Sequence, residues 1–290
     1  NSTDATQNII SSITDNSIEI SKGTLINWAK EASEKLEPEI ENIEKELLDA
    51  YYANIDESQI KVNGEAFNEV CASNTKRTRM WAMKCKKHEE LEKIKFFKKF
   101  MGVIVKDGTD LYNGFGIAFS QCISHIQRYL KGIYDFINHK GPKNMAMFLT
   151  KYNEYRKELI AKGEEKFGDK EYKQIMNEYD EIIRGWKKEW MTDNDNPLYD
   201  DERKLLSRME EADKEQILYF LKDFKVPATN NQVETDQRNI KIKQKIGKFR
   251  SEVGAEIYAI IRSCINTYKK QAINVYSALI KAFNNETIIA

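Results

Sequence analysis

The sequence predicts an α/β fold with a strand-rich first half and a long helical segment after it. Between residues 51 and 123, apolar residues form short clusters or alternate with polar residues, as they do in strands. Residues 142–222 instead carry apolar side chains at helical spacing. Only 4 Pro and 13 Gly are present, which favours helices over a turn-rich β-sandwich. We therefore expect a sheet and long helices within one chain.

Residues 1–50 are expected to form a helical lead before the strands. Residues 1–20 are polar and predict a frayed end. A helix is expected from Ser21, and Pro38 suits the first turn of a second helix. The apolar faces are Leu25, Trp28, Ala32 and Leu36 in the first helix, and Ile40, Ile43, Leu47 and Tyr51 in the second.

Residues 51–140 are expected to hold the first part of the core. Trp81, Met83 and Cys85 alternate with less apolar neighbours, which is typical of a half-buried strand. The expected strands are residues 51–62, 66–73, 78–86, 102–105 and 118–123, and the expected helices are residues 88–100 and a helix from residue 125 on.

Residues 141–226 are expected to be helical, and residues 227–290 to add the last helices of the core. Pro142 suits a first helical turn, and Asp169 is expected to cap a helix through residue 191. Helical spacing returns over residues 204–224. The later helices are expected to be capped by Thr229 and Asn230, by Ser251, and to end with a helix containing Val275, Leu279, Ala282 and Phe283.

The composition is that of a soluble globular chain. Hydrophobic residues make up 41% and charged residues 32%, and no apolar run approaches the length of a membrane span. The start of the chain has no signal-peptide pattern, and the 4 scattered cysteines favour a reducing compartment, so a cytoplasmic location is expected. With a formal net charge of +0, any nucleic acid must be contacted by local basic patches.

Three acids stand out by position among the 46 acidic residues of the chain. Asp56 lies within the first expected strand, Asp107 ends the fourth, and Glu234 lies in the first turns of the helix after residue 227. A carboxylate in a buried strand is costly without a partner or a metal ion. Converging carboxylates can hold two Mg²⁺ ions about 4 Å apart for phosphodiester chemistry. The alternative is that these acids cap helices or are solvated at strand ends.

The last third of the chain contains a long ordered motif, and shorter motifs precede it. The long motif is Val226–Glu234, Arg238, Lys241–Lys245, Phe249–Ala255, Ile260–Ser263 and Lys270–Asn274. The shorter ones are Asp56-Glu57-Ser58, the strand Val103–Gly108, and Cys122-Ile-Ser-His125 with Arg128. Together they resemble transposases of the insertion sequence sixty-six family, with matches from about Ser21 to Asn284.

The resemblance implies a ribonuclease-H-like mixed sheet flanked by helices, with a large all-helical insertion before the third acidic residue. It implies a DDE triad of Asp56, Asp107 and Glu234, which is both catalytic and metal-binding, with two Mg²⁺ or Mn²⁺ ions. The 234 − 107 = 127 positions before the third acid leave room for the insertion. The implied activity is DNA strand cleavage and strand transfer at the ends of a mobile element. The implied partners are DNA and further copies of the chain, at the nucleoid of a bacterial cytoplasm.

Three neighbours of the acids depart from the family pattern. Ser58 stands where Thr is usual, Lys106 stands where His is usual, and Thr235 stands where Arg is usual. The last change affects a phosphate contact near the site, whereas the three acids are kept. The family's N-terminal zinc-binding and helix-turn-helix parts are not matched in this sequence. We therefore expect weak DNA binding with no preference for element ends.

Cys122, His125 and Arg128 are expected to support the site. A structural zinc site needs about four ligands. The other candidate ligands have no recognisable spacing, and they are Cys71, Cys85, Cys264, His88 and His139. A buried thiol with a hydrogen-bonded imidazole is therefore preferred over zinc.

A basic segment follows Glu234 and is expected to contact DNA phosphates. It contains Arg238, Lys241, Lys243, Lys245, Lys248 and Arg250. The alternation of its lysines with Ile240 and Ile242 points them away from the core, although a solvated face is the alternative. Trp186 and Trp190 are one helical turn apart and either stack on a DNA end or belong to the core, the core being favoured.

Two alternatives from other functional classes stay open. A domesticated DNA-binding protein with the same fold would bind DNA without metal-dependent cleavage. A purely helical interaction module would lack the sheet, and the three acids would then be accidental. A junction resolvase is a variant within the same class, which would cut DNA without joining it.

Overall fold

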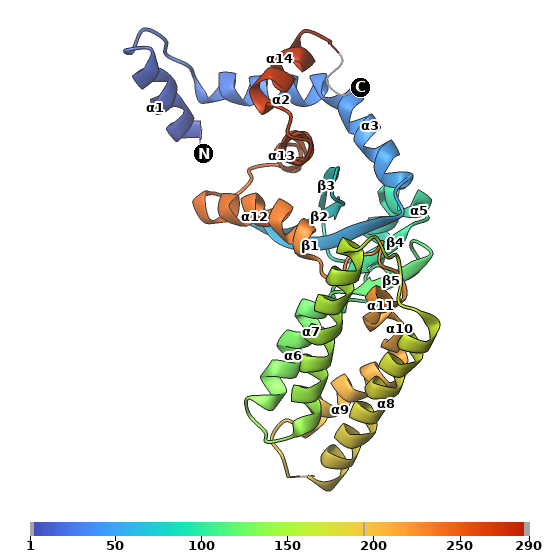
Figure 1. The fold of residues 1–290 in the computed structure, drawn as a ribbon. Coiled ribbons are helices and arrows are strands. Elements are labelled where there is room, and N and C mark those ends of the chain that lie inside the picture. Colours follow the sequence, from blue (N-terminus) through green and yellow to red (C-terminus); the bar gives the residue numbers. More distant parts are fainter. Residues whose placement is uncertain (1–2, 194, 287–290) are drawn as a thin grey trace. The chain divides into compact units, whose positions relative to one another are not determined.

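The computed structural model describes residues 3–193 and 195–286, drawn as a ribbon in Figure 1. Contacts divide the chain into two units. Unit 1 contains residues 1–102, 111–116 and 231–290, and unit 2 contains residues 103–110 and 117–230. Each unit therefore combines segments that are distant in the sequence.

Unit 1 contains three antiparallel strands, β1 (Tyr52–Val62), β2 (Glu65–Ser73) and β3 (Thr78–Met83), in the order β3-β2-β1. Asn63 and Gly64 join the first two strands with φ angles of 50° and 87°. These left-handed conformations are those of a type I′ hairpin turn, for which Asn-Gly is a strong sequence signal. Local sequence therefore fixes the position of this hairpin.

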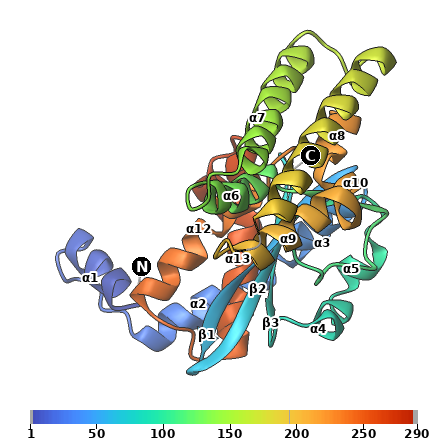
Figure 2. The ribbon, with the colours of Figure 1, turned by 90° about the horizontal axis from the view of Figure 1, so that it is seen from below.

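Helices pack on both faces of the sheet that these three strands form. On one face, α12 (Asn231–Ile246) packs on β1 and β2, and α13 (Glu252–Lys270) packs on β3 (Figure 2). On the other face, Trp81 of β3 packs on α5 (Lys95–Lys99), with its ring centroid 5.2 Å from that of Phe96. β3 is therefore covered on both sides, whereas Gln59 and Lys61 of β1 stay exposed on the face opposite α12.

The other helices of unit 1 are α1 (Thr3–Ile13), α2 (Lys22–Lys35), α3 (Glu37–Leu48), α4 (His88–Lys93) and α14 (Val275–Phe283). The cap predicted at Ser251 is present, since Ser251 Oγ accepts from Gly254 N, and Ser21 Oγ caps α2 in the same way by accepting from Thr24 N. These bonds satisfy backbone donors that the first helical turn leaves without a partner.

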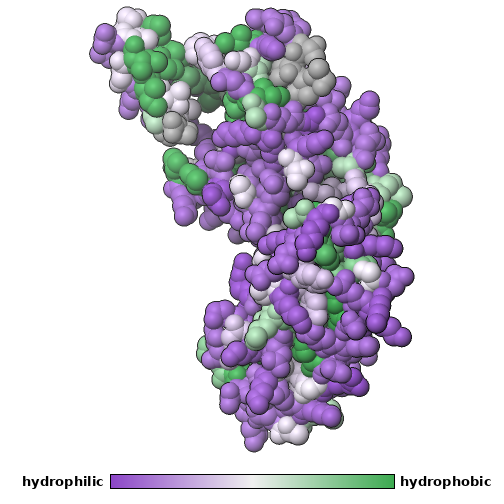
Figure 3. Space-filling view, viewed as in Figure 1, coloured by the Kyte–Doolittle hydropathy of each residue, from purple (hydrophilic) through white to green (hydrophobic). Residues whose placement is uncertain are grey.

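α1 shows that the expectation of a frayed end was wrong. No Pro or Gly interrupts the helix, Lys22 forms an ion pair with Asp4, and Gln7 Nε2 donates to Ile20 O at 2.6 Å. These contacts hold a helix that buries none of its own side chains. Ile13 is 77% exposed, and Figure 3 shows the hydrophobic surface at α1.

The prediction of a single helix over residues 88–100 is also wrong. The segment forms two helices, α4 and α5, which are separated at Ile94. Leu91 and Phe96 are both buried, with exposures of 0% and 2%. Residues five apart point in different directions on one straight helix. The break at Ile94 allows both side chains to reach the core.

Unit 2 begins with two parallel strands, β4 (Val103–Lys106) and β5 (Ala118–Gln121), whose last residues are register partners. Its helical segments are α6 (Ile123–Tyr134), α7 (Lys140–Ala161), α8 (Asp169–Thr192), α9 (Tyr199–Ser207), the π-helical turn η1 (Arg208–Ala212), α10 (Lys214–Ile217) and α11 (Tyr219–Lys222).

A buried polar group joins three of these helices. Glu202 of α9 is 0% exposed and accepts from Trp186 Nε1 of α8 at 2.6 Å. It also contacts His139 Nδ1, at the start of α7, at 2.8 Å, and Asn196 Nδ2 at 3.1 Å. These partners offset the cost of burying the carboxylate.

The long helix expected over residues 204–224 is divided into α9, η1, α10 and α11. Its apolar side chains from Leu205 to Phe224 are too widely spread around a cylinder for one straight helix to bury them all. In contrast, α12 is one unbroken helix from Asn231 to Ile246. The α/β class is confirmed, and the strands show that a purely helical module is wrong.

Candidate functional site

Asp56 lies on β1 with its side chain on the face that α12 covers. Side chains alternate along a strand, so Asp56 shares a face with Ser58 and Ile60. Ser58 Oγ donates to Gln237 Oε1 at 3.2 Å, and Ile60 packs in a cluster with Ile240. Gln237 and Ile240 belong to α12, so the half-buried carboxyl group of Asp56 points toward that helix.

Glu57 points to the opposite face of β1. Its carboxylate accepts a hydrogen bond from Tyr112 Oη and forms an ion pair with Lys86. Its backbone N–H donates to Asp56 Oδ1 at 2.9 Å. Of the two adjacent acids, Asp56 is therefore the one that faces α12.

Glu234 is positioned by the same helix, in the first turn of α12. Gln237, three residues later, donates through Nε2 to Asp56 O at 3.1 Å. Residues three apart are neighbours on a helix surface. The half-buried Glu234 therefore lies one turn from the residue that joins α12 to the backbone of Asp56.

Asp107 belongs to unit 2 and directly follows β4. Its Oδ1 accepts from Thr109 N at 3.0 Å, which closes a tight loop. Lys106, at 1% exposure, supports the loop by donating from Nζ to Thr109 O at 2.7 Å. Burial lowers the pKa of Lys106, although nearby acids, among them Asp107, oppose this shift.

The donor chemistry of Asp56 and Glu234 fits a hard divalent cation. Both offer carboxylate oxygens, which are the ligands that Mg²⁺ prefers. Among the described residues of each unit, no three His, Cys, Asp or Glu side chains lie close enough together to coordinate one metal ion.

Glu69 is a functional candidate that the sequence pattern does not single out. It is 2% exposed, and neither of its carboxyl oxygens has a hydrogen-bond partner among the described residues. Burial raises its pKa to about 8, and the charge of Asp56 contributes. Its strand partner is Ser58, so Glu69 lies on the same face as Asp56. The signal that could have found it is its place between the apolar Phe67 and Cys71, which lie two residues away on the same face of the strand.

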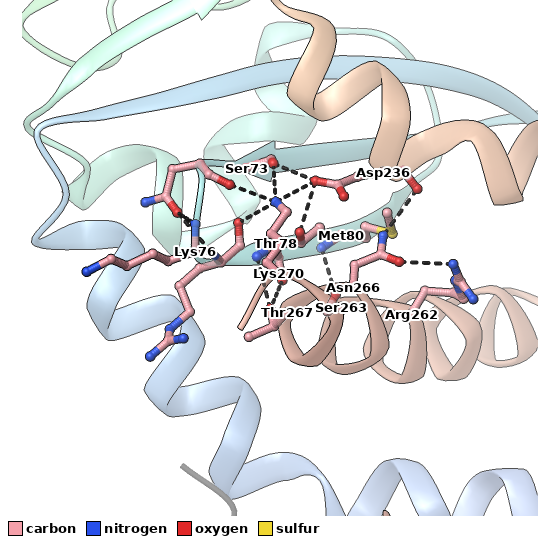
Figure 4. Close-up of polar contacts among 12 residues, drawn as sticks. Ser73, Lys76, Thr78, Met80, Asp236, Arg262, Ser263, Asn266, Thr267 and Lys270 are labelled. Atoms are coloured by element: carbon pink, nitrogen blue, oxygen red, sulfur yellow. Dashed lines mark hydrogen bonds and ion pairs between the residues drawn. The ribbon is translucent and has the colours of Figure 1, made fainter. Parts of the chain in front are cut away.

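A buried ion pair anchors α12 at Asp236, two residues after Glu234, and Figure 4 shows its two members, Asp236 and Lys270. Lys270 Nζ of α13 lies 2.7 Å from Asp236 Oδ2 of α12. The same Asp236 oxygen accepts from Ser73 Oγ at 2.5 Å and from Thr78 Oγ1 at 3.0 Å. Two helices and two strands of unit 1 therefore meet at one carboxylate oxygen.

Cys122 and His125 form a polar contact at the start of α6. Burial raises the pKa of the Cys122 thiol, but hydrogen bonds from His125 and from Asn230 N outweigh it, so the pKa is lowered overall. The contact from Asn230 N to Sγ measures 3.1 Å, and Cys122 N donates to Lys106 O at 2.8 Å. Cys122 therefore connects β4 to the chain that leads into α12. Arg128 is exposed on the same helix.

The basic segment after Glu234 does not alternate as expected, because most of it is helical. Arg238, Lys241 and Lys245 are exposed at spacings of three and four residues, so they share a face of α12 with Glu234. Lys243 points elsewhere and donates from Nζ to Gly247 O at 3.1 Å.

The rest of that segment differs from the expectation in a similar way. Ile242 was expected to face the core but is 48% exposed, whereas Ile240 is 2% exposed. A helical period of 3.6 residues cannot bury both positions, as a strand would. Lys248 and Arg250 are exposed beyond the end of α12.

The tryptophan pair in α8 belongs to the core side of that helix. Trp186 is 0% exposed, and Trp190 stacks on Tyr199 with ring centroids 4.9 Å apart. The expectation that core packing is the favoured role agrees with this placement. Lys187 pairs with Glu210 at 2.7 Å.

Comparison with known proteins gives one family. A family model described as "Transposase IS66 family" matches residues 7–257, which is most of the chain. A search of curated proteins finds no match. No helix among the described residues has both the length and the apolar character needed to cross a membrane.

Proposed function

Because the chain belongs to the Transposase IS66 family, we propose that it is a DDE transposase with Asp56, Asp107 and Glu234 as its catalytic acids. The observation that carries the proposal is the contact between α12 and β1. Gln237 joins the two elements at Asp56, one turn from Glu234. The antiparallel strands of unit 1 and the parallel pair of unit 2 are compatible with a ribonuclease-H-like mixed sheet, with residues 141–226 as its helical insertion.

In this proposal Asp56, Asp107 and Glu234 would together hold two Mg²⁺ or Mn²⁺ ions. When bound, these ions would stabilise negative charge on the attacking and leaving oxygens of a phosphodiester. Glu234 would orient the attacking water for strand cleavage and the 3′-hydroxyl for strand transfer. Both steps are in-line displacements at phosphorus, so one arrangement of side chains serves both.

DNA is the partner that the family implies, and α12 offers a route toward the acids. Arg238, Lys241 and Lys245 lie on the helix face that carries Glu234. Positive side chains at this spacing would follow the phosphates of one strand. We propose that a homo-oligomer assembles on DNA, with one copy of the chain acting at each element end.

The test compares Asp56→Asn with Glu57→Gln in the full chain. The first variant removes an acid from the face covered by α12, and the second removes its neighbour on the other face. Single-turnover nicking of supercoiled DNA and strand transfer from pre-cleaved ends are measured with Mg²⁺ or Mn²⁺. Asp56→Asn should slow both by at least about a hundredfold, and Glu57→Gln should retain most activity.

Two results would contradict the proposal. Activity of Asp56→Asn within about threefold of the parent chain would show that Asp56 is not catalytic. Absent cleavage by the parent chain, with DNA binding retained, would favour a domesticated, non-catalytic DNA-binding protein instead, and metal-independent cleavage would contradict the role of the divalent ions.

A further inference from the structure

An arginine from the helical segment of unit 2 reaches the loop that follows Asp107. Arg208 begins the π-helical turn η1, 101 positions after Asp107 (208 − 107). A Cβ atom built on Gly108 would lie 2.4 Å from Arg208 Nη2, well inside contact distance. Glycine at position 108 therefore leaves the space that the guanidinium group occupies.

The π-helical turn fixes the direction of this arginine. Asp213 N donates to Arg208 O at 2.8 Å, a bond that spans five residues. Residues five apart do not face each other on an α-helix, but this turn brings them together. As a result, Arg208 Nε donates to Asp213 Oδ2 at 2.7 Å. Single π turns within helices are frequently found at functional sites.

A second contact ties the guanidinium to the end of the parallel strands. Arg208 Nη2 donates to Gln121 Oε1 at 3.0 Å. Gln121 is the last residue of β5 and the register partner of Lys106, which precedes Asp107. Gln121 Nε2 in turn donates to Gln216 Oε1 at 3.4 Å. The planar group is therefore held on two sides before any ligand binds.

Arg208 retains free donors on the accessible side of its guanidinium group. Its side chain is 30% exposed. Nε and one Nη2 hydrogen serve the contacts with Asp213 and Gln121, so of its five N–H donors three have no partner among the described residues. It also lines a pocket of about 400 Å³ together with Arg128, Lys204 and Asp201. Three cations and one acid give this pocket a positive charge.

We propose that Arg208 binds a DNA phosphodiester beside Asp107, as a phosphate-binding residue supplied by the helical segment between the second and third acids. This inference rests on the proposed function. A guanidinium group presents its donors in a rigid fork that matches phosphate oxygens. Because Asp213 and Gln121 already orient it, little side-chain freedom is lost when DNA binds. Its charge would stabilise the negative charge that develops during cleavage.

The first test removes the charge at position 208 in the full chain. Arg208→Gln is compared with Arg203→Gln, a matched control on α9 that is 56% exposed and pairs with Asp200 at 3.4 Å. Single-turnover cleavage at saturating DNA should slow at least about tenfold for Arg208→Gln and stay near parental for Arg203→Gln. Arg208→Lys should restore only part of the rate, because lysine lacks the rigid fork.

The second test displaces the guanidinium without changing its charge. Gly108→Ala forces a Cβ atom into the position of Nη2, so it should slow cleavage in the parent chain. In an Arg208→Gln background the same change should have little further effect. If Gly108→Ala slows both backgrounds equally, it acts through Asp107 directly and the proposed role of Arg208 is overturned.

DNA binding separates failure of this inference from failure of the proposed function. With a duplex titrated at several salt concentrations, Arg208→Gln should flatten the slope of log affinity against log salt by about 0.9, the value for one phosphate that is no longer neutralised. An unchanged slope and rate for Arg208→Gln, while Asp107→Asn is inactive, would overturn the inference alone. A parent chain that cleaves nothing, with the slope change still present, would overturn the proposed function alone.

Discussion

Glu69 places a carboxyl group inside unit 1 with no hydrogen-bond partner among the described residues. The pKa of Glu69 is raised from 4.5 to about 8, mainly by burial and also by the charges of Asp56 and Asp236, while Arg262 and Lys241 oppose the shift. At pH values between about 4.5 and about 8, Glu69 therefore stays protonated in the folded chain but loses its proton in the unfolded chain. Stability contributed by protonated Glu69 is therefore complete below about pH 4.5 and is lost as pH rises toward about 8.

This linkage predicts how the parent chain compares with Glu69→Gln. The two should differ little near pH 4.5, and the variant should gain relative stability as pH rises to about 8. The steepest expected change is about 1.4 kcal/mol per pH unit. Urea unfolding at several pH values with EDTA present measures it. A constant difference between the two proteins would show that Glu69 ionises normally.

The Asp236–Lys270 pair leads to a second prediction at the same scale. Both side chains are less than 10% exposed, at 7% and 9%. Lys270→Met should reduce the free energy of unfolding by about 3–5 kcal/mol, because it leaves a buried carboxylate without its cation. Lys84→Gln, which removes an exposed partner of Glu252, should leave it nearly unchanged.

A double variant separates the pair from general packing damage. Asp236→Asn combined with Lys270→Met should cost less than the sum of the single changes, since neither charge is then left alone. Strict additivity in chemical denaturation would show that the two groups do not stabilise each other.

At the scale of elements, α12 combines packing, anchoring and charge on different faces. Val233 and Ile240 are buried at 0% and 2% exposure. Asp236 and Gln237 anchor the helix to the strands, and Glu234 shares the basic face with Arg238, Lys241 and Lys245. The helical period separates these roles, so changes to one face need not disturb another.

This separation predicts the effect of neutralising the exposed face. Replacing Arg238, Lys241 and Lys245 together with Gln should flatten the log-affinity slope against log salt by about 0.9 for each phosphate that is no longer neutralised. The decrease in affinity should be similar for all DNA sequences. Lys243→Gln, on the same helix but turned toward Gly247, should change the slope much less. If Lys243→Gln flattens the salt slope as much as each replacement at Arg238, Lys241 or Lys245, DNA binding does not depend on the face of α12 that carries the charge.

At the scale of the whole molecule, the three acids come from both units. Asp56 and Glu234 belong to unit 1, and Asp107 belongs to unit 2. If the three acids act in one site, removing any one of them should abolish most of the cleavage that the other two support. This requirement can be tested without knowing the DNA ends.

The prediction is that the acids act as one group. Asp56→Asn and Asp107→Asn should each slow cleavage by at least about a hundredfold, roughly 2.7 kcal/mol of barrier. The double variant should be no more than about threefold slower than the slower single variant. Multiplied effects, near ten-thousandfold, would show that the two aspartates act independently. Single-turnover nicking is the measurement.

Much of the local structure could be predicted from the sequence. The β1–β2 hairpin is signalled by Asn63-Gly64, and Ser21 and Ser251 cap the helices expected after them. The placement of Asp56 in a strand and of Glu234 in a first helical turn also agrees with expectation. Turns, caps and periodicity depend on residues within one or two turns of each other, so the sequence by itself determines them.

Only the tertiary structure decided which of these residues meet. Alternation separates Asp56 from Glu57, but the packing of α12 decides which acid faces the helix. The burial of Glu69 and the approach of Arg208 to Gly108 join segments far apart in the chain. The free energy of burial depends on which surfaces come together, and no local pattern encodes that pairing. For this reason the sequence determined the local turns, caps and most of the elements, and packing decided where helices break and which side chains meet.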